Sequence, residues 1–207
     1  MSAAHAAAIL LKCAGPLPAP EELQPLLKKI ALDCVPAAES IAAHAAAEGN
    51  EAYVYLFSRN FSAIGSDMPA RIIERARSLP ELNGLQLGAA RLEPVFNAAG
   101  ASHRDAAPFH YVVETDVLPE HEADLNAWYD IEHMPGLAAC PGSVRARRFR
   151  NPDASPRYHS CYDLASTETL GSKPWLAVRH SAWSDRVRPH FRNTRRTMFR
   201  RLFEIAL

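Results

Sequence analysis

One order of secondary-structure elements occurs twice along this chain of 207 residues. Aromatic and β-branched runs predict strands, apolar residues three and four apart predict helices, and Gly, Pro and Asn mark the turns between them. Both halves then give the order β-α-β-β-α-β. Because a repeat requires each half to fold in the same way, it constrains the fold more than any figure of composition. The elements are expected at 7–14, 21–32, 40–46, 52–58, 70–79 and 87–96, and again at 109–116, 120–133, 143–150, 157–164, 173–188 and 198–205.

Each half therefore predicts a ferredoxin-like unit of the α+β class, a four-stranded antiparallel sheet with both helices on one face. The other face of such a sheet needs a cover if it is apolar, and the second half of the chain can supply one. We expect the two sheets to pack face to face with a cavity between them. The alternative, two independent domains on a linker, would leave one face of each sheet exposed. The predicted parts are a degenerate repeat at 1–97, a small and polar linker at 98–107, and a second repeat at 108–207.

Charge and hydropathy narrow the class of partner. The formal net charge is zero and the pI is about 7.1, so no overall field attracts nucleic acid or anionic membrane. No window reaches the roughly 18 apolar residues of a membrane span, and the Ala-rich start lacks the basic region of a signal peptide. We therefore expect a cytoplasmic protein that has neither nucleic acid nor membrane as a partner.

Cysteine and histidine spacing predicts no metal site. The four cysteines Cys13, Cys34, Cys140 and Cys161 form no CxxC pair and are interpreted as small buried hydrophobic residues. The nine histidines form neither an HxH nor an HxxxH pattern.

The densest group of polar and aromatic residues lies at 126–136, with the sequence NAWYDIEHMPG. On a helix, Tyr129 and His133 are four residues apart and share a face, and Asn126 lies one turn before Tyr129. An imidazole titrates near neutral pH and a phenol can donate a hydrogen bond to an enolate or carbonyl oxygen, so this face can transfer a proton. Asp130 and Glu132 would point elsewhere, as capping or solvated residues. The helix is expected to end near residues 134–136.

A structural interpretation of the same group competes with the catalytic one. Trp128, Tyr129 and Ile131 could be core residues, and His133 could form an ordinary hydrogen bond near the helix end. The matching stretch of the first half, 26–36 (LLKKIALDCVP), has no Tyr, His or Trp. This difference between the halves favours a special role for the second.

The run NAWYDIEHMPG, followed by PGSVRARRFR and RYHSCYDL, resembles the dimeric α/β-barrel superfamily and, within it, the EthD-like group with its N-x-W-Y-x-x-E-H-x-P pattern. The resemblance covers about residues 108–205. It implies that the two repeats form an intrachain dimeric α/β barrel, with a homo-oligomer as a further possibility. It also implies His133 as the base and Tyr129 as the orienting donor, with Asn126, Trp128 and Glu132 matching the pattern around the ligand.

Strand residues could face the same cavity. His110 shares one face of its strand with Glu114, and Arg145 and Arg147 share one face of theirs, where an arginine could pair with a ligand carboxylate. Alternation does not tell which face points inward, and a charge-alternating edge strand explains the arginines equally well. The eight arginines between Arg179 and Arg201 are interpreted as a solvated face with inter-subunit ion pairs rather than as an RNA or phosphate site.

Three functions follow from these residues and the resemblance. The first is an EthD-like enzyme that carries out cofactor-free acid/base chemistry, namely cyclisation, isomerisation or oxygenation, on a small apolar or aromatic compound. The second is a non-catalytic protein of the same fold that binds a small ligand or serves in assembly. The third, by analogy with haem-degrading members of the superfamily, is a haem-binding protein. A cavity beside His133 would favour the first function over the second.

Overall fold

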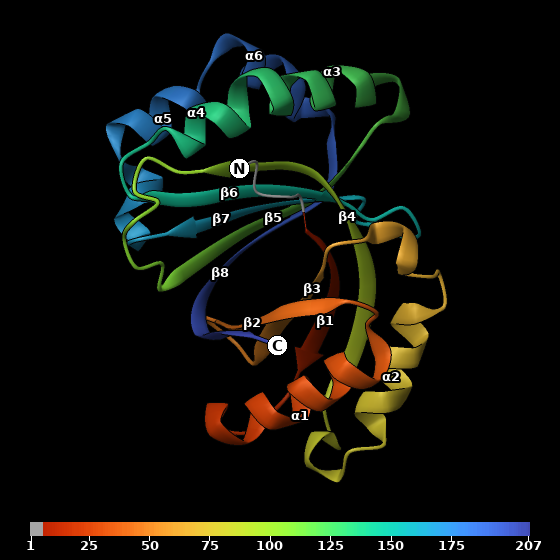
Figure 1. The fold of residues 1–207 in the computed structure, drawn as a ribbon. Coiled ribbons are helices and arrows are strands. Elements are labelled where there is room, and N and C mark those ends of the chain that lie inside the picture. Colours follow the sequence, from red (N-terminus) through yellow and green to blue (C-terminus); the bar gives the residue numbers. More distant parts are fainter. Residues whose placement is uncertain (1–5) are drawn as a thin grey trace. The chain divides into compact units, whose positions relative to one another are not determined.

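A computed structural model describes residues 6–207 (Figure 1). These residues form eight strands in the closed order β1-β3-β2-β8-β5-β7-β6-β4. They divide into two compact units, one of residues 6–94 with 151–154 and 199–207, the other of residues 95–150 and 155–198. The strands are β1 Ala7–Ala14, β2 Ala38–Ala46, β3 Glu51–Ser58, β4 Gln86–Ala99, β5 Phe109–Val117, β6 Ser143–Arg150, β7 Tyr158–Leu164 and β8 Phe191–Ala206.

In the first unit, β3 pairs with β1 on one side and β2 on the other, and all these pairs are antiparallel. Helices α1 (Pro20–Cys34) and α2 (Met68–Arg77) belong to the same unit. Alternation along β1 turns Ile9 and Leu11 toward one side, and α1 adds Leu23 and Leu27, four residues apart, to the same buried cluster. This apolar core accounts for the Ala- and Leu-rich composition of the first half.

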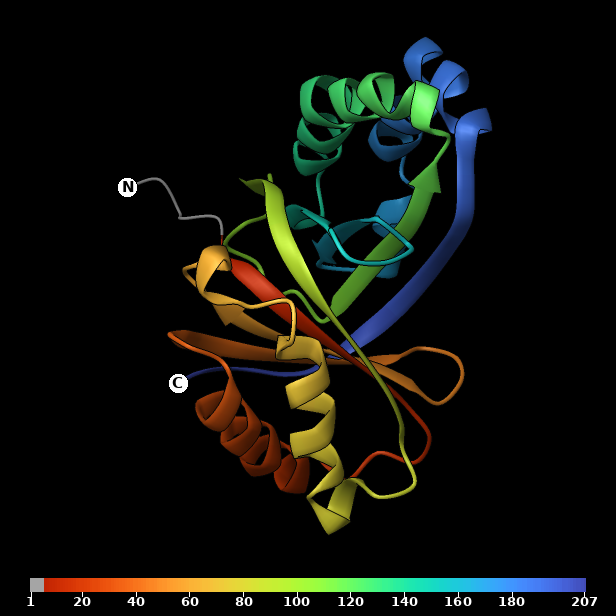
Figure 2. The same cartoon turned by 90° about the vertical axis from the view of Figure 1, so that its right-hand side faces the viewer.

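In the second unit, β7 pairs antiparallel with β5 and with β6. Figure 2 shows the helices of this unit together on one side of its strands. Tyr111 of β5 lies opposite Tyr162 of β7, and both side chains belong to the apolar cluster that the helices cover. The helices are α3 Glu122–Trp128, a π-helical turn Tyr129–His133, α4 Met134–Ala138, α5 Lys173–Arg179 and α6 Ala182–Val187.

The α+β class and the order of elements agree with the sequence-based prediction, and most strands lie within two residues of their expected bounds. Three expectations were wrong. The helix does not end near 134–136, because α4 follows the π-helical turn directly and continues through Pro135 to Ala138. The helix expected at 173–188 is two helices, since the Ser181 side chain caps α6. Strand β4 runs to Ala99, three residues beyond its expected end at residue 96.

Strand β8 also begins earlier than predicted, at Phe191 rather than at residue 198. Its polar first half has no apolar alternation, but Thr194 Oγ1 lies 2.8 Å from Thr115 Oγ1 of β5, and this contact holds the segment beside β5.

Four expectations stay predictions: the face-to-face packing of two repeats, the domain boundaries, a cytoplasmic location and a homo-oligomer. Among residues 6–207, no helix has the length and apolarity that crossing a membrane requires.

Candidate functional site

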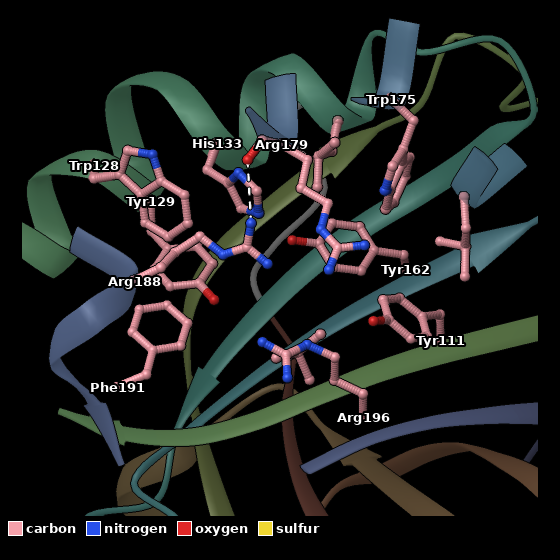
Figure 3. A pocket seen from close by; sticks show the side chains of 13 residues that line it. Tyr111, Trp128, Tyr129, His133, Tyr162, Trp175, Arg179, Arg188, Phe191 and Arg196 are labelled. Atoms are coloured by element: carbon pink, nitrogen blue, oxygen red, sulfur yellow. Dashed lines mark hydrogen bonds between the residues drawn. The ribbon is translucent and has the colours of Figure 1, made fainter. Parts of the chain in front are cut away.

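The second unit contains a small cavity of about 50 Å³ between its helices and its strands (Figure 3). Side chains from β5, the π-helical turn, α5 and β8 converge on it, so residues far apart in sequence share one space. The walls are aromatic and apolar apart from one histidine and three arginines. Thirteen residues line it: Tyr111, Val113, Trp128, Tyr129, His133, Leu137, Tyr162, Leu170, Trp175, Arg179, Arg188, Phe191 and Arg196.

The π-helical turn brings three aromatic rings of the motif together. In a π-helix the backbone bonds run from residue i to i+5, so residues five apart lie one above the other. The Trp128 ring accordingly stacks on the His133 ring at a centroid distance of 4.1 Å, and the Tyr129 ring meets His133 edge-on at 5.3 Å. Trp128 and Tyr129 are buried, and both contact the cavity. The predicted proximity of Tyr129 and His133 is therefore present, with Trp128 as a closer neighbour than an α-helix would give.

His133 is held in its neutral form. Burial, followed by repulsion from Arg188, Arg179 and Arg148, lowers the pKa of the imidazole to about 3. A neutral imidazole has one donor and one acceptor nitrogen. Within the described part of the chain, the buried Nδ1 has no hydrogen-bond partner. The imidazole lines the cavity, and its tautomer decides which of the two ring nitrogens accepts a proton.

This lowered pKa predicts an acid-sensitive fold. The unfolded chain protonates His133 below its ordinary pKa of about 6.5 and the folded chain only near 3, so the unfolded state binds more protons in between. The stability contributed by the neutral ring is therefore present above pH 6.5 and is lost as pH falls toward 3. Thermal unfolding of the wild type and of His133→Gln between pH 7.5 and about 4.5 should show a smaller fall in Tm for the variant. Equal falls would contradict the neutral assignment.

Three arginines face the cavity without a carboxylate among its lining residues. Arg179 is the last residue of α5, Arg188 follows α6, and Arg196 belongs to β8. Arg188 Nη1 donates a hydrogen bond to the main-chain oxygen of Arg179 at 3.2 Å (Figure 3). Burial and repulsion from the other two guanidinium groups lower the pKa of Arg188. The cavity is thus a positively charged space with aromatic walls.

A fourth arginine supports the site from behind. The Arg148 side chain is 1% exposed, and its guanidinium lies 4.2 Å from the ring centroid of Tyr129 and 4.3 Å from that of Tyr158. Arg148 Nη2 donates to Asn126 Oδ1 at 2.8 Å, and Asn126 Nδ2 donates to the Tyr158 hydroxyl at 3.1 Å. Asn126 therefore does not line the cavity but fixes the arginine on which the Tyr129 ring packs.

Tyr129 keeps its proton. Burial raises the pKa of this phenol, although the nearby Arg148 acts in the opposite direction. A neutral phenol can donate a hydrogen bond to an oxygen that becomes negative. This state is the one that the orienting role predicted for Tyr129 requires.

One expectation and one part of the competing structural interpretation were wrong for neighbouring residues. Glu132 is not a solvated or capping residue: its Oε1 accepts a hydrogen bond from Trp128 Nε1 at 3.2 Å and another from the Ser181 hydroxyl. It therefore orients the indole that stacks on His133, and it joins the π-helical turn to the start of α6. Ile131 is not a core residue, because it is 68% exposed.

His110, Arg145 and Arg147 lie on the face of the strands opposite to the cavity. Strand pairing sets His110 and Arg145 against Asp163, whereas Tyr111 and Tyr162, one residue along, line the cavity. His110 Nδ1 and Arg147 Nη2 each contact a carboxylate oxygen of Asp163, at 2.8 and 2.9 Å. Arg145 Nε donates to Asn97 Oδ1 at 2.8 Å. These three residues do not join the group around His133.

Sequence reasoning missed most of the cavity wall. The arginines at 179, 188 and 196 were assigned to a solvated face, because the expected continuous helix at 173–188 hides the turn that redirects Arg188. The available signal was Trp175, which precedes the arginine-rich stretch, and Phe191, which lies within it, since large aromatic residues among arginines are unusual on a purely solvated surface. No group of three or more His, Cys, Asp or Glu side chains suited to a metal occurs in the described part of the chain.

Comparison with known proteins leaves the family open and establishes the fold. No protein-family model matches the chain, and no curated protein matches it in sequence. Solved structures do match over nearly the whole length. A candidate monooxygenase of Fusobacterium nucleatum subsp. nucleatum has a TM-score of 0.68 at 9% identity and covers 99% of this chain and 95% of its own. This likeness shows an α/β-barrel fold.

Two further structures widen the range of activities seen on this fold. An anthrone oxidase-like protein has a TM-score of 0.60 at 13% identity, over 98% of this chain and 93% of its own. A heme-degrading enzyme of Listeria monocytogenes has a TM-score of 0.54 at 7% identity, over 93% of this chain and 98% of its own. Since these barrels differ in activity, the function has to be argued from the cavity.

Proposed function

We propose that the chain is an EthD-like enzyme that carries out cofactor-free acid/base chemistry on a small aromatic compound, with His133 as the base and Tyr129 as the hydrogen-bond donor. The observation that carries the proposal is a neutral imidazole on the wall of an aromatic cavity that three arginines make positive. Cyclisation, isomerisation and oxygenation share a first step that such a cavity can promote.

In that step His133 accepts a proton from a phenolic O–H or from a carbon beside a carbonyl group. The electron pair of the broken bond then spreads onto the substrate oxygen. Arg188 and the Tyr129 hydroxyl stabilise this oxygen as it becomes negative. The anion can be protonated at another carbon, attack a carbonyl carbon of the same molecule, or form a C–O bond with dioxygen.

The low pKa of His133 applies to the empty cavity. Part of the shift comes from repulsion by the surrounding arginines. A negative ligand offsets this repulsion, so the pKa of the imidazole rises when an anion occupies the cavity. His133 is therefore a weak base in the free protein and a stronger one in the complex, which confines proton transfer to the bound substrate.

Two alternatives are less well supported. If the site were a core filled by side chains, with no catalytic role, we would expect no cavity beside His133. The three arginines around this cavity would then have no explanation. Haem fits less well than a single-ring ligand, because a four-ring macrocycle needs several times the space of one ring and the cavity measures about 50 Å³.

Isotope exchange tests the first step whatever follows it. Phenylpyruvate and phenylacetone each carry acidic C–H bonds beside a single aromatic ring, and proton NMR in D₂O without oxygen would follow the loss of these protons. We expect the protein to accelerate exchange for at least one of the two probes above the rate in buffer. Rates equal to those in buffer for both would contradict the proposed function.

A further inference from the structure

The positive charges around the cavity indicate a class of substrate, in addition to their role in proton transfer. We propose that the cavity selects an aromatic carboxylate, whose ring lies against Tyr162 and Trp175 and whose carboxylate is bound by Arg179 and Arg196. This inference rests on the proposed function for the reaction itself. It adds a charged group that the reaction does not require.

The first support is an excess of cations without counter-ions. None of the thirteen lining residues is Asp or Glu. No ion pair of Arg179, Arg188 or Arg196 with a carboxylate occurs in the part of the chain that the structure describes, whereas the nearby Arg186 pairs with Asp124 at 3.0 Å. Three guanidinium groups that face one small space repel one another, so the empty cavity favours a bound anion.

The second support is the direction of the guanidinium groups. Figure 3 shows those of Arg179, Arg188 and Arg196 pointing toward the same space, although they come from α5, the turn after α6, and β8. Arg188 lies beside His133 and donates a hydrogen bond to the main-chain oxygen of Arg179. The guanidinium groups of Arg179 and Arg196 therefore remain to bind a carboxylate of the ligand. A guanidinium binds a carboxylate through two parallel hydrogen bonds, a geometry that suits this pair.

The third support is the shape of the apolar wall. Tyr162 meets Trp175 edge-on at a centroid distance of 5.2 Å and lies beside Tyr111 at 6.2 Å. Flat walls of this kind favour an aromatic ring over an aliphatic chain. The cavity of about 50 Å³ does not enclose even one ring as it stands, so we propose no more than a single-ring ligand, whose entry requires the exposed Arg196 side chain to move aside.

A matched pair of ligands tests the charge. Hydrocinnamate and hydrocinnamamide have the same shape and differ in the carboxylate, and isothermal titration calorimetry at low salt gives both affinities. We expect hydrocinnamate to bind at least about tenfold more tightly, the effect of one charge-assisted hydrogen bond. Arg179→Gln and Arg196→Gln should each remove most of this preference. Arg192→Gln removes the same charge from an exposed residue that does not line the cavity, and should leave the preference unchanged.

Several outcomes would overturn the inference: equal affinity for the two ligands, no measurable binding of either, or an equal loss in the Arg192→Gln control. If phenyl phosphate binds about tenfold more tightly than hydrocinnamate, the anionic group that the cavity selects is a phosphate ester and not a carboxylate. The inference and the proposed function fail separately. A preference for hydrocinnamate with no isotope exchange refutes only the function, and equal exchange of phenylpyruvate and the uncharged phenylacetone refutes only the carboxylate.

Discussion

Replacement of His133 by Gln is expected to lower the rate of isotope exchange by about 10²- to 10⁴-fold, the usual contribution of a positioned general base. Gln can donate and accept hydrogen bonds but cannot take up a proton at neutral pH, so the variant keeps the polarity of the site and loses the chemistry. Exchange of phenylpyruvate, followed by proton NMR in D₂O, measures the effect.

The control for this variant is the affinity for hydrocinnamate. His133→Gln should bind this ligand with an affinity close to that of the wild type, because the imidazole is assigned to proton transfer and not to the carboxylate. Tyr129→Phe, which removes only the hydroxyl, should show a smaller loss of exchange. A His133→Gln variant that exchanges phenylpyruvate at the wild-type rate would end the assignment of His133 as the base.

Replacement of Asn126 by Ala should lower the free energy of unfolding by about 2–3 kcal/mol, since it removes the hydrogen-bond acceptor of a buried guanidinium. Asn126 Oδ1 is 2.8 Å from Arg148 Nη2, and Arg148 Nε already has no partner among the described residues. The loss would leave the cation under Tyr129 poorly satisfied. Urea denaturation of both proteins at pH 7.5 measures the difference.

A conservative variant separates the role of the acceptor from that of side-chain volume. Asn126→Asp retains an oxygen for Arg148 and should lose less than half of the stability that Asn126→Ala loses. The exchange rate should fall further in Asn126→Ala than in Asn126→Asp, because Tyr129 packs on Arg148. If Asn126→Ala unfolds within about 0.5 kcal/mol of the wild type, the support assigned to Arg148 is absent.

The strands could be predicted from the sequence because their signals are local. Residues 143–150 alternate and end at a Pro-containing turn, and the structure places β6 at Ser143–Arg150. The second helical region could not be bounded in the same way. Its break after His180 depends on the cap that Ser181 provides, and its residues have helical propensity on both sides of the break.

The candidate site was predictable where it lies within one helix turn and hidden where it depends on packing. The spacing of Tyr129 and His133 suffices to bring their rings together. The stacking of Trp128 on His133 depends on a π-helical turn, which could not be predicted from the sequence. Arg188 reaches the cavity only because α6 is short, and His110 turns away from it because strand register, not composition, decides which face meets the helices.

A crystal structure of the protein with phenylpyruvate would show whether the cavity binds the substrate class proposed for it. We expect density for one ligand molecule in the cavity, with its ring against Tyr162 and Trp175, its carboxylate between Arg179 and Arg196, and its benzylic carbon within reach of His133. Density at another place, with the cavity filled by its own side chains, would contradict both the acid/base function and the carboxylate specificity.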